Sequence, residues 1–175
     1  MNSDVKQRAE ELLSRLSLKE KVAQLNQEML GKGASDELKE KIRRGETGSV
    51  ILANSSTAGN DKQQKLHTAL VNELQRIAVE ESPSGIPLIF GRDVIHGHNT
   101  VLPVPLALAA SFNPELVRQG YRCVAKEAAN DGVQWAFSPM IDISRDPRWG
   151  RCIEGIGEDP YLGERMAEAV VRGFQ

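Results

Sequence analysis

Two polar segments of the chain carry the residue types that could do chemistry. In the first, Asp93 comes shortly after the apolar run IPLIF, where a buried strand would end. In the second, residues 138–162, the sequence SPMIDISRDPRWGRCIEGIGEDPYL places arginines at a spacing of three: Arg145, Arg148 and Arg151. Ionised side chains make strong hydrogen bonds, and the paired oxygens of a carboxylate suit adjacent hydroxyls. The two segments therefore indicate a binding site for a ligand with hydroxyl groups, such as a sugar.

The three arginines cannot all face a ligand, because charge that leaves water needs a partner. The planar fork of arginine favours pairing with a carboxylate. We expect one arginine to reach the ligand and the others to brace the loop through nearby acidic residues. The candidate partners are Asp142, Asp146, Glu154 and Glu158.

A metal site is a second interpretation of the first segment. His96 and His98 follow Asp93 closely, and histidine and aspartate are common zinc ligands. The chain has three histidines in all, and no further His or Cys cluster completes such a site. The histidines are therefore expected to shape the loop by hydrogen bonding, and neither a metal nor another cofactor is expected.

Composition and motifs narrow the function classes further. The 175 residues include 22 basic and 24 acidic side chains, so no positive surplus indicates nucleic acid or an anionic membrane as partner. The longest apolar run, VLPVPLALAA, contains two prolines and is too short to span a bilayer. No GxSxG elbow, Walker A loop or GxGxxG fingerprint is present.

The cellular location is predicted from the first residues and the cysteines. The opening MNSDVKQRAEELLSRL has no basic segment followed by an apolar one, so no secretory signal is visible and a cytoplasmic location is expected if residue 1 is the true start. Cys123 and Cys152 lie far apart and lack CxxC spacing, which is typical of reduced thiols.

The elements before the first polar segment are read from capping signals and apolar spacing. Ser17 and Glu20 have capping-box spacing and open a predicted helix whose one face carries Val22, Leu25 and Met29. A second helix is predicted over residues 36–44, ending at Gly45, and a short buried strand over 48–52.

The remaining elements alternate between helix and strand. Helices are predicted over residues 60–80, over about 114–130 behind the Asn113 cap, and from the acidic start at Glu158 and Asp159. Strands are predicted over 86–90 and 134–143.

Alternating strands and helices indicate parallel βα units, with reactive groups in the loops that follow the strands. About three such units do not close a (β/α)₈ barrel, which takes roughly 250 residues. The expected fold class is therefore α/β, either a small open sheet or the first part of an incomplete (β/α)₈ barrel that occupies residues 1–175.

The two polar segments also resemble a known family. The stretches GIPLIFGRDVIHGHNTVLPVPLALAASFNPEL and EAANDGVQWAFSPMIDISRDPRWGRCIEGIGEDPYLGERMAEAVVRGFQ are similar to the N-terminal domain of glycoside hydrolase family 3, in its β-glucosidase and β-xylosidase branch. LSLKEKVAQL near the start matches the opening helix of that family, so the resemblance covers residues 17–175. The ordered motifs DxxHG, SPxxDxxRDPRWGR and GEDPYL make it specific.

The resemblance implies retaining hydrolysis of terminal β-D-glucosyl or xylosyl residues through a covalent glycosyl-enzyme intermediate. Asp93 and Arg151 fall on the family's sugar-binding aspartate and arginine. The residues expected to brace them are His96, Arg145, Asp146, Arg148 and Glu154. The implied ligand is a β-linked oligosaccharide or an aryl or alkyl β-glucoside.

The catalytic residues of the family are not expected within this chain. The nucleophilic aspartate sits in an SDW or TDW loop, which is absent from residues 1–175, and the acid/base glutamate belongs to a later domain. The chain is therefore expected to be a truncated, inactive part of a longer enzyme. A non-catalytic sugar-binding or interaction protein is the alternative, and a metal-dependent hydrolase built on Asp93, His96 and His98 is a third.

Overall fold

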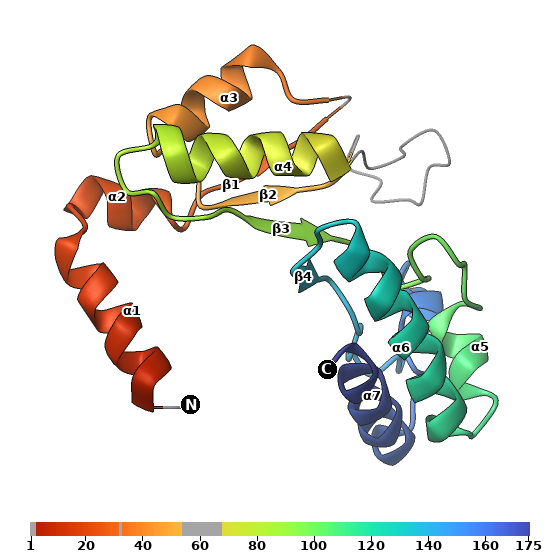
Figure 1. Ribbon diagram of the computed structural model, residues 1–175. Helices are drawn as coiled ribbons and strands as arrows, with labels where there is room; N and C mark the ends of the chain where they lie inside the picture. The colour runs from red at the N-terminus through yellow and green to blue at the C-terminus, as the bar shows by residue number, and fades with distance from the viewer. Residues whose placement is uncertain (1–2, 32, 54–67) are drawn as a thin grey trace. The chain divides into compact units, whose positions relative to one another are not determined.

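The computed structural model describes residues 3–31, 33–53 and 68–175, which form two compact units. The first unit contains the described residues up to Gly91, and the second runs from Arg92 to Gln175 (Figure 1). In chain order the elements are α1 (Ser3–Arg15), α2 (Leu18–Ala23), β1 (Gln27–Met29), α3 (Asp36–Arg43), β2 (Ser49–Ile51), α4 (Thr68–Arg76), the π-helical turn η1 (Ile77–Glu81), β3 (Ile89–Arg92), α5 (Pro105–Ala109), α6 (Pro114–Asn130), β4 (Trp135–Ala136), the 3₁₀ turn η2 (Cys152–Glu154) and α7 (Pro160–Phe174).

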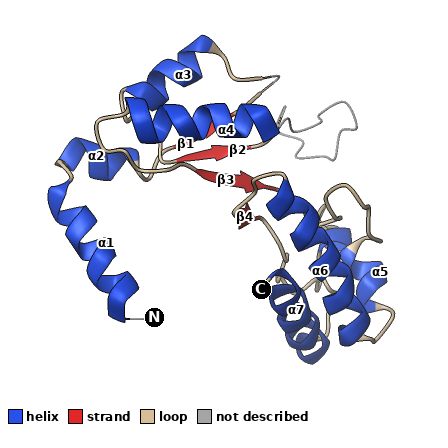
Figure 2. Ribbon diagram, in the orientation of Figure 1, coloured by secondary structure: helices blue, strands red, loops and turns tan. Residues whose placement is uncertain are grey.

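A parallel sheet forms the centre of the first unit, as Figure 2 shows by the direction of its strands. Ser49 of β2 is in register with Gln27 of β1 and with Ile89 of β3. The central residues Val50 and Phe90 are fully buried, because α3 and α4 cover one side of these strands (Figure 1). The prediction of an α/β fold with parallel strands is confirmed.

The prediction of one helix reaching Met29 is wrong. The capping box of Ser17 and Glu20 is present, but α2 ends at Ala23 and Met29 closes strand β1. Val22 and Leu25 are 59% and 86% exposed, so their helical spacing marks no buried face. Pairing with β2 decides the conformation here, and such pairing outweighs local periodicity in a three-residue strand.

The other expectations for the first unit hold in part. Helix α3 ends beside Gly45, whose φ of 65° suits a helix stop, and strand β2 lies within the predicted range 48–52. The strand predicted at 86–90 is shifted to β3, Ile89–Arg92. Of the helix predicted over 60–80, residues 60–67 lie outside the described part of the chain, and the remainder forms α4 and η1.

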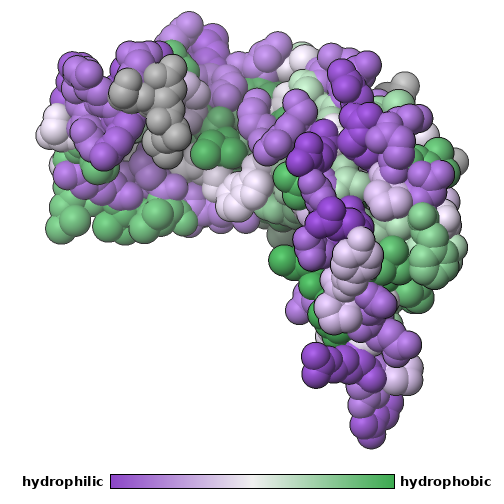
Figure 3. Space-filling view, turned by 90° about the horizontal axis from the view of Figure 1, so that it is seen from below, coloured by the Kyte–Doolittle hydropathy of each residue, from purple (hydrophilic) through white to green (hydrophobic). Residues whose placement is uncertain are grey.

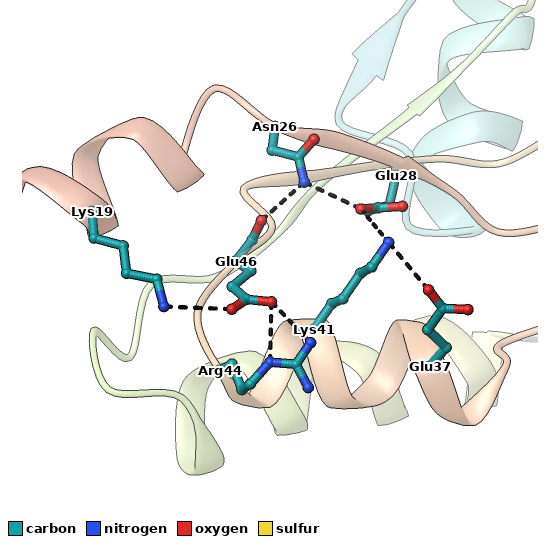
Figure 4. Close-up of polar contacts among 7 residues, drawn as sticks. All are labelled: Lys19, Asn26, Glu28, Glu37, Lys41, Arg44 and Glu46. Atoms are coloured by element: carbon teal, nitrogen blue, oxygen red, sulfur yellow. Dashed lines mark hydrogen bonds and ion pairs between the residues drawn. The ribbon is translucent and has the colours of Figure 1, made fainter.

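A polar network joins α2, β1, α3 and the turn before β2 (Figure 4). The Asn26 amide donates to the Glu46 carbonyl at 2.9 Å and to Glu28 Oε1 at 3.2 Å. Lys41 Nζ lies 3.0 Å from the same Glu28 oxygen, which raises the pKa of Lys41. The network lies where β1 and β2 begin, so it supports the sheet from the end opposite the strand-following loops.

Helices α6 and α7 pack on each other in the second unit. The Tyr121 and Phe174 rings lie 5.5 Å apart between centroids, within a core that also contains Val124, Met166 and Val170. Both helices begin as predicted.

The caps of these helices are the ones their sequences indicate. Asn113 Oδ1 accepts from Leu116 N at 3.1 Å, and Asp159 Oδ1 accepts from Leu162 N at 2.9 Å. The capping interpretation of Asp159 is therefore confirmed.

The strand predicted over residues 134–143 is much shorter than expected. Only Trp135 and Ala136 form β4. The N–H of the next residue, Phe137, donates a hydrogen bond to the Arg92 carbonyl at 2.9 Å. Pro139 has no N–H to offer a sheet, so the chain leaves the strand and enters the arginine-rich loop.

The strand order is β1-β2-β3-β4, so each strand neighbours its predecessor. Sequential order is typical of a (β/α)₈ barrel, whereas a doubly wound sheet reverses its order at a switch point. The prediction of about three βα units missed β1, because four strands are present in the described residues.

Apolar side chains also reach the surface. Figure 3 shows hydrophobic patches among the hydrophilic residues. Within the described ranges, no helix is long and apolar enough to cross a membrane. The exposed large hydrophobic residues of α1 and α2 are Val5, Leu12, Leu13, Leu18 and Val22.

Candidate functional site

Asp93 lies directly after β3, at the carboxyl end of the strand. Its Oδ1 accepts a hydrogen bond from the backbone N–H of Ile95 at 3.0 Å, which orients the carboxylate. Among the described residues, none donates a hydrogen bond to the second oxygen. The side chain is partly exposed, so the second oxygen can accept from a ligand hydroxyl.

A tight turn follows Asp93. The N–H of Gly97 donates to Val94 O at 3.0 Å, and the N–H of Leu102 donates to His96 O at 2.7 Å. Gly97 has a φ of 101°, and a Cβ at this position would lie 2.0 Å from Thr100 O. The turn therefore needs glycine, and it fixes where His96 stands relative to Asp93.

Helix α6 holds this loop at separate points along its length. The Tyr121 hydroxyl donates to Ile95 O at 2.8 Å, and burial raises the pKa of Tyr121 to about 12. Nε2 of His98 lies 2.7 Å from Oδ2 of Asp131 and hydrogen-bonds to it. The interpretation of these histidines as loop-shaping residues is confirmed for His98, which is almost wholly buried.

The strongest attachment is made by Glu127 near the end of α6. Its Oε2 accepts from Asn99 N at 3.0 Å and from Thr100 N at 2.8 Å, and its Oε1 accepts from Thr100 Oγ1 at 2.6 Å. Three bonds from one carboxylate thus hold the tip of the turn.

The arginine-rich loop contains two local ion pairs. Arg148 Nη2 and Nε bind the Asp146 carboxylate, which lowers the pKa of Asp146. Arg151 Nη2 lies 2.7 Å from Glu154 Oε2 and Nε lies 3.1 Å from the same oxygen. This pairing raises the pKa of Arg151 and lowers that of Glu154.

The two loops lie within electrostatic reach of each other in the second unit. The carboxylates of Asp142 and Asp93 add to the effect of Glu154 in raising the pKa of Arg151. His96 similarly adds to the effect of Arg151 in lowering the pKa of Glu154. Arg151 and Glu154 are in direct contact, and Asp93 and His96 lie within electrostatic range of this pair.

Three other candidates, Arg145, Asp146 and Arg148, form no ion pair with this group among the described residues. Arg145 is exposed, and no ion pair links it to another described residue. The pair formed by Arg148 and Asp146 is also exposed, so solvent screens it and it adds little stability. The bracing roles of these residues stay predictions.

Sequence reasoning missed several residues that support the site. Glu127 lies in α6 and Asp131 caps its C-terminus, and neither has a local feature that sets it apart; their partners lie 27–33 positions away. Arg92 was also passed over, although it is only 6% exposed. Burial lowers the pKa of Arg92, against the opposing effect of Asp131 and Asp93.

The metal interpretation gains no support from the geometry. Across residues 3–31, 33–53 and 68–175, no group of three or more His, Cys, Asp or Glu side chains could hold a metal ion. His98 is committed to Asp131, as described above.

Comparison with known proteins gives a consistent picture. The chain is 39% identical over 166 residues to a periplasmic beta-glucosidase of Salmonella typhimurium, a match that covers 94% of this chain and 20% of the relative. It is 34% identical to a putative beta-xylosidase of Formosa agariphila, over 98% of this chain and 24% of the relative. The crystal structure of beta-glucosidase from Listeria innocua in complex with glucose matches with a TM-score of 0.79 and 36% identity, over 97% of this chain and 24% of that one.

These matches correct one prediction. The expected cytoplasmic location is wrong, because the Salmonella relative is named as periplasmic. The chain spans 20% of the length of the Salmonella relative and 24% of that of the Formosa relative.

The family itself is settled by a direct match. The model of the glycosyl hydrolase family 3 N-terminal domain matches residues 17–175, which include both loops of the candidate site. The fold, with its sequential parallel strands, agrees with that match. The chain therefore belongs to glycosyl hydrolase family 3.

Proposed function

We propose that Asp93 and Arg151 form part of the glycone-binding site of a retaining β-glycosidase. The observation that carries this proposal is the position of Asp93 at the end of β3, with one carboxylate oxygen available and Arg151 in electrostatic range. A carboxylate and a guanidinium group together supply acceptors and donors for sugar hydroxyls. Glu154 holds the Nε and Nη2 side of Arg151, which leaves Nη1 to face a ligand.

The proposed reaction is hydrolysis of terminal β-D-glucosyl or β-D-xylosyl residues through a covalent glycosyl-enzyme intermediate. Such a mechanism uses two carboxyl groups about 5–5.5 Å apart, one as nucleophile and one as acid/base. Neither is assigned within residues 1–175, so these residues by themselves are expected to bind the glycone without hydrolysing it. The substrates proposed are β-linked oligosaccharides and aryl or alkyl β-glucosides.

The location proposed for the protein is the periplasm, as named for the Salmonella relative. Cell fractionation with an antibody against this chain tests it. Recovery only with cytoplasmic markers would contradict it.

The function is tested with the complete gene product that contains this chain. Asp93→Asn keeps the shape of the side chain and an acceptor for Ile95 N, but removes the charge. Losing one charge-assisted hydrogen bond costs about 1.5–3 kcal/mol, so glucose affinity and kcat/KM for an aryl β-glucoside should fall about 10–100-fold. Asp36→Asn, at an exposed position in the first turn of α3, is the matched control.

Three outcomes decide the proposal. A large loss for Asp93→Asn alone supports it. Unchanged glucose affinity in Asp93→Asn contradicts it. Glucose binding by the unsubstituted gene product with no hydrolysis of any aryl β-glycoside would instead support the non-catalytic sugar-binding alternative.

A further inference from the structure

We infer that Glu127 is a positioning residue that sets the place of Asp93 in the glycone site. This inference rests on the function proposed for Asp93 and extends it to a residue that lies on a different element. In this proposal Glu127 does not itself bind the sugar. It acts through the loop, residues 93–102, that carries Asp93.

The first step is the strength of the attachment. A single carboxylate accepts from Asn99 N, Thr100 N and Thr100 Oγ1 at 2.6–3.0 Å. Bonds to an ionised acceptor are about twice as strong as neutral ones. Desolvation by itself would raise the pKa of Glu127. The hydrogen bonds from Thr100 and Asn99 stabilise the ionised carboxylate and lower the pKa overall.

The second step is how a displacement at Thr100 reaches Asp93. The turn between them cannot absorb it, because the Thr100 carbonyl already abuts Gly97 so closely that a Cβ there would lie 2.0 Å away. Gly97 N is bonded to Val94 O, and Ile95 N is bonded to the Asp93 carboxylate. The chain from Glu127 to Asp93 is therefore continuous through hydrogen bonds and one backbone contact.

The third step is the second anchor of the same loop on the same helix. The Tyr121 hydroxyl donates a hydrogen bond to the carbonyl of Ile95, and the N–H of Ile95 orients the Asp93 carboxylate. Tyr121 and Glu127 lie six positions apart on α6, so the same rigid helix anchors both ends of the turn. Removing Glu127 leaves the turn held at Ile95 by Tyr121 and at His98 by Asp131, while Thr100 and the backbone N–H of Asn99 lose their anchor.

The variants separate positioning from folding. Glu127→Ala removes all three acceptor contacts. Glu127→Gln keeps one oxygen for the two backbone N–H groups, and its amide can donate to the Thr100 hydroxyl, so it should rescue the loss. Glu115→Ala is the matched control, because Glu115 is on the same helix and pairs only with Arg118 and Gln119 among the residues described.

The measurement is the inhibition constant of free glucose for the complete gene product, taken well below the unfolding midpoint of each variant. Misplacing a binding group by a fraction of an ångström has large effects, so Glu127→Ala should weaken glucose binding about tenfold. Glu127→Gln and Glu115→Ala should stay within about twofold of the original protein. A purely structural role would lower the midpoint of Glu127→Ala and leave the glucose constant unchanged, which would overturn the inference.

A double-substitution cycle ties the effect to Asp93. If Glu127 acts through Asp93, adding Glu127→Ala to Asp93→Asn should weaken glucose binding by no more than about twofold beyond Asp93→Asn alone. Full additivity would overturn the inference. The function proposed for Asp93 is tested apart from it, since it fails only if Asp93→Asn by itself binds glucose normally.

Discussion

Gly97→Ala offers a sharp test of the loop geometry. The φ of 101° lies in a region that residues with a Cβ adopt at a cost of about 1–3 kcal/mol. The added Cβ would also lie 2.0 Å from Thr100 O and 3.1 Å from Thr100 C, both backbone atoms. Overpacking of this kind costs about 1–3 kcal/mol more. The closed turn would thus be destabilised by about 2–6 kcal/mol.

A local opening is the smaller cost, so we expect the turn to open while the rest of the second unit stays folded. Opening breaks the hydrogen bond from Leu102 N to His96 O, which contributes about 0.5–1.5 kcal/mol. Backbone amide exchange at Leu102 should therefore become much faster in Gly97→Ala, and glucose affinity of the complete gene product should fall.

Gly120→Ala is the matched control for this substitution. Gly120 lies within α6, and its added Cβ would meet only Leu102 side-chain carbons at 3.6–3.7 Å, which is ordinary contact. Alanine is favoured over glycine in a helix by about 1 kcal/mol, so Gly120→Ala should be neutral or stabilising. Unchanged amide exchange and unchanged glucose affinity in Gly97→Ala would refute the geometry described for the turn.

Two further predictions concern α6 and α7. In Gly173→Ala the new Cβ would lie 2.7 Å from Arg118 O, so overpacking of about 1–3 kcal/mol outweighs a helix-propensity gain of about 1 kcal/mol. Its Tm should fall by a few degrees, and an equal or higher Tm would show that the two helices lie further apart. Hydrogen bonds from Arg118 and Gln119 lower the pKa of Glu115 from 4.5 to about 2. Its stabilising effect is therefore present above pH 4.5 and lost as the pH falls towards 2. Urea unfolding of Glu115→Gln should differ from the original at pH 6 and converge with it near pH 2, whereas a constant difference would contradict the pairing.

Local signals predicted where three of the helices begin. Ser17 with Glu20, Asn113 and Asp159 each bond to a backbone N–H three positions away, so the information needed lies within one helical turn. Strand β1 had no such signal. Its three residues take their conformation from pairing with β2, which lies 22 positions later in the chain.

The candidate site likewise contains residues that the sequence identified and residues that only the tertiary structure revealed. The sequence by itself identified Asp93 and Arg151, because a charged residue after an apolar strand stands out and the surrounding motifs are specific. Their roles at the glycone stay predictions. It also determined the family, through runs of residues that a profile can match.

Only the tertiary structure decided what holds these residues in place. The Arg151 side chain pairs with Glu154, three positions away. The sequence alone offered three other carboxylates as candidate partners. The Asp93 loop is held by Tyr121 and Glu127 of α6 and by Asp131, which caps that helix, at separations of 26–33 positions. No pattern in the sequence connects groups so far apart, because their meeting depends on how α6 packs back along the strand-following loop.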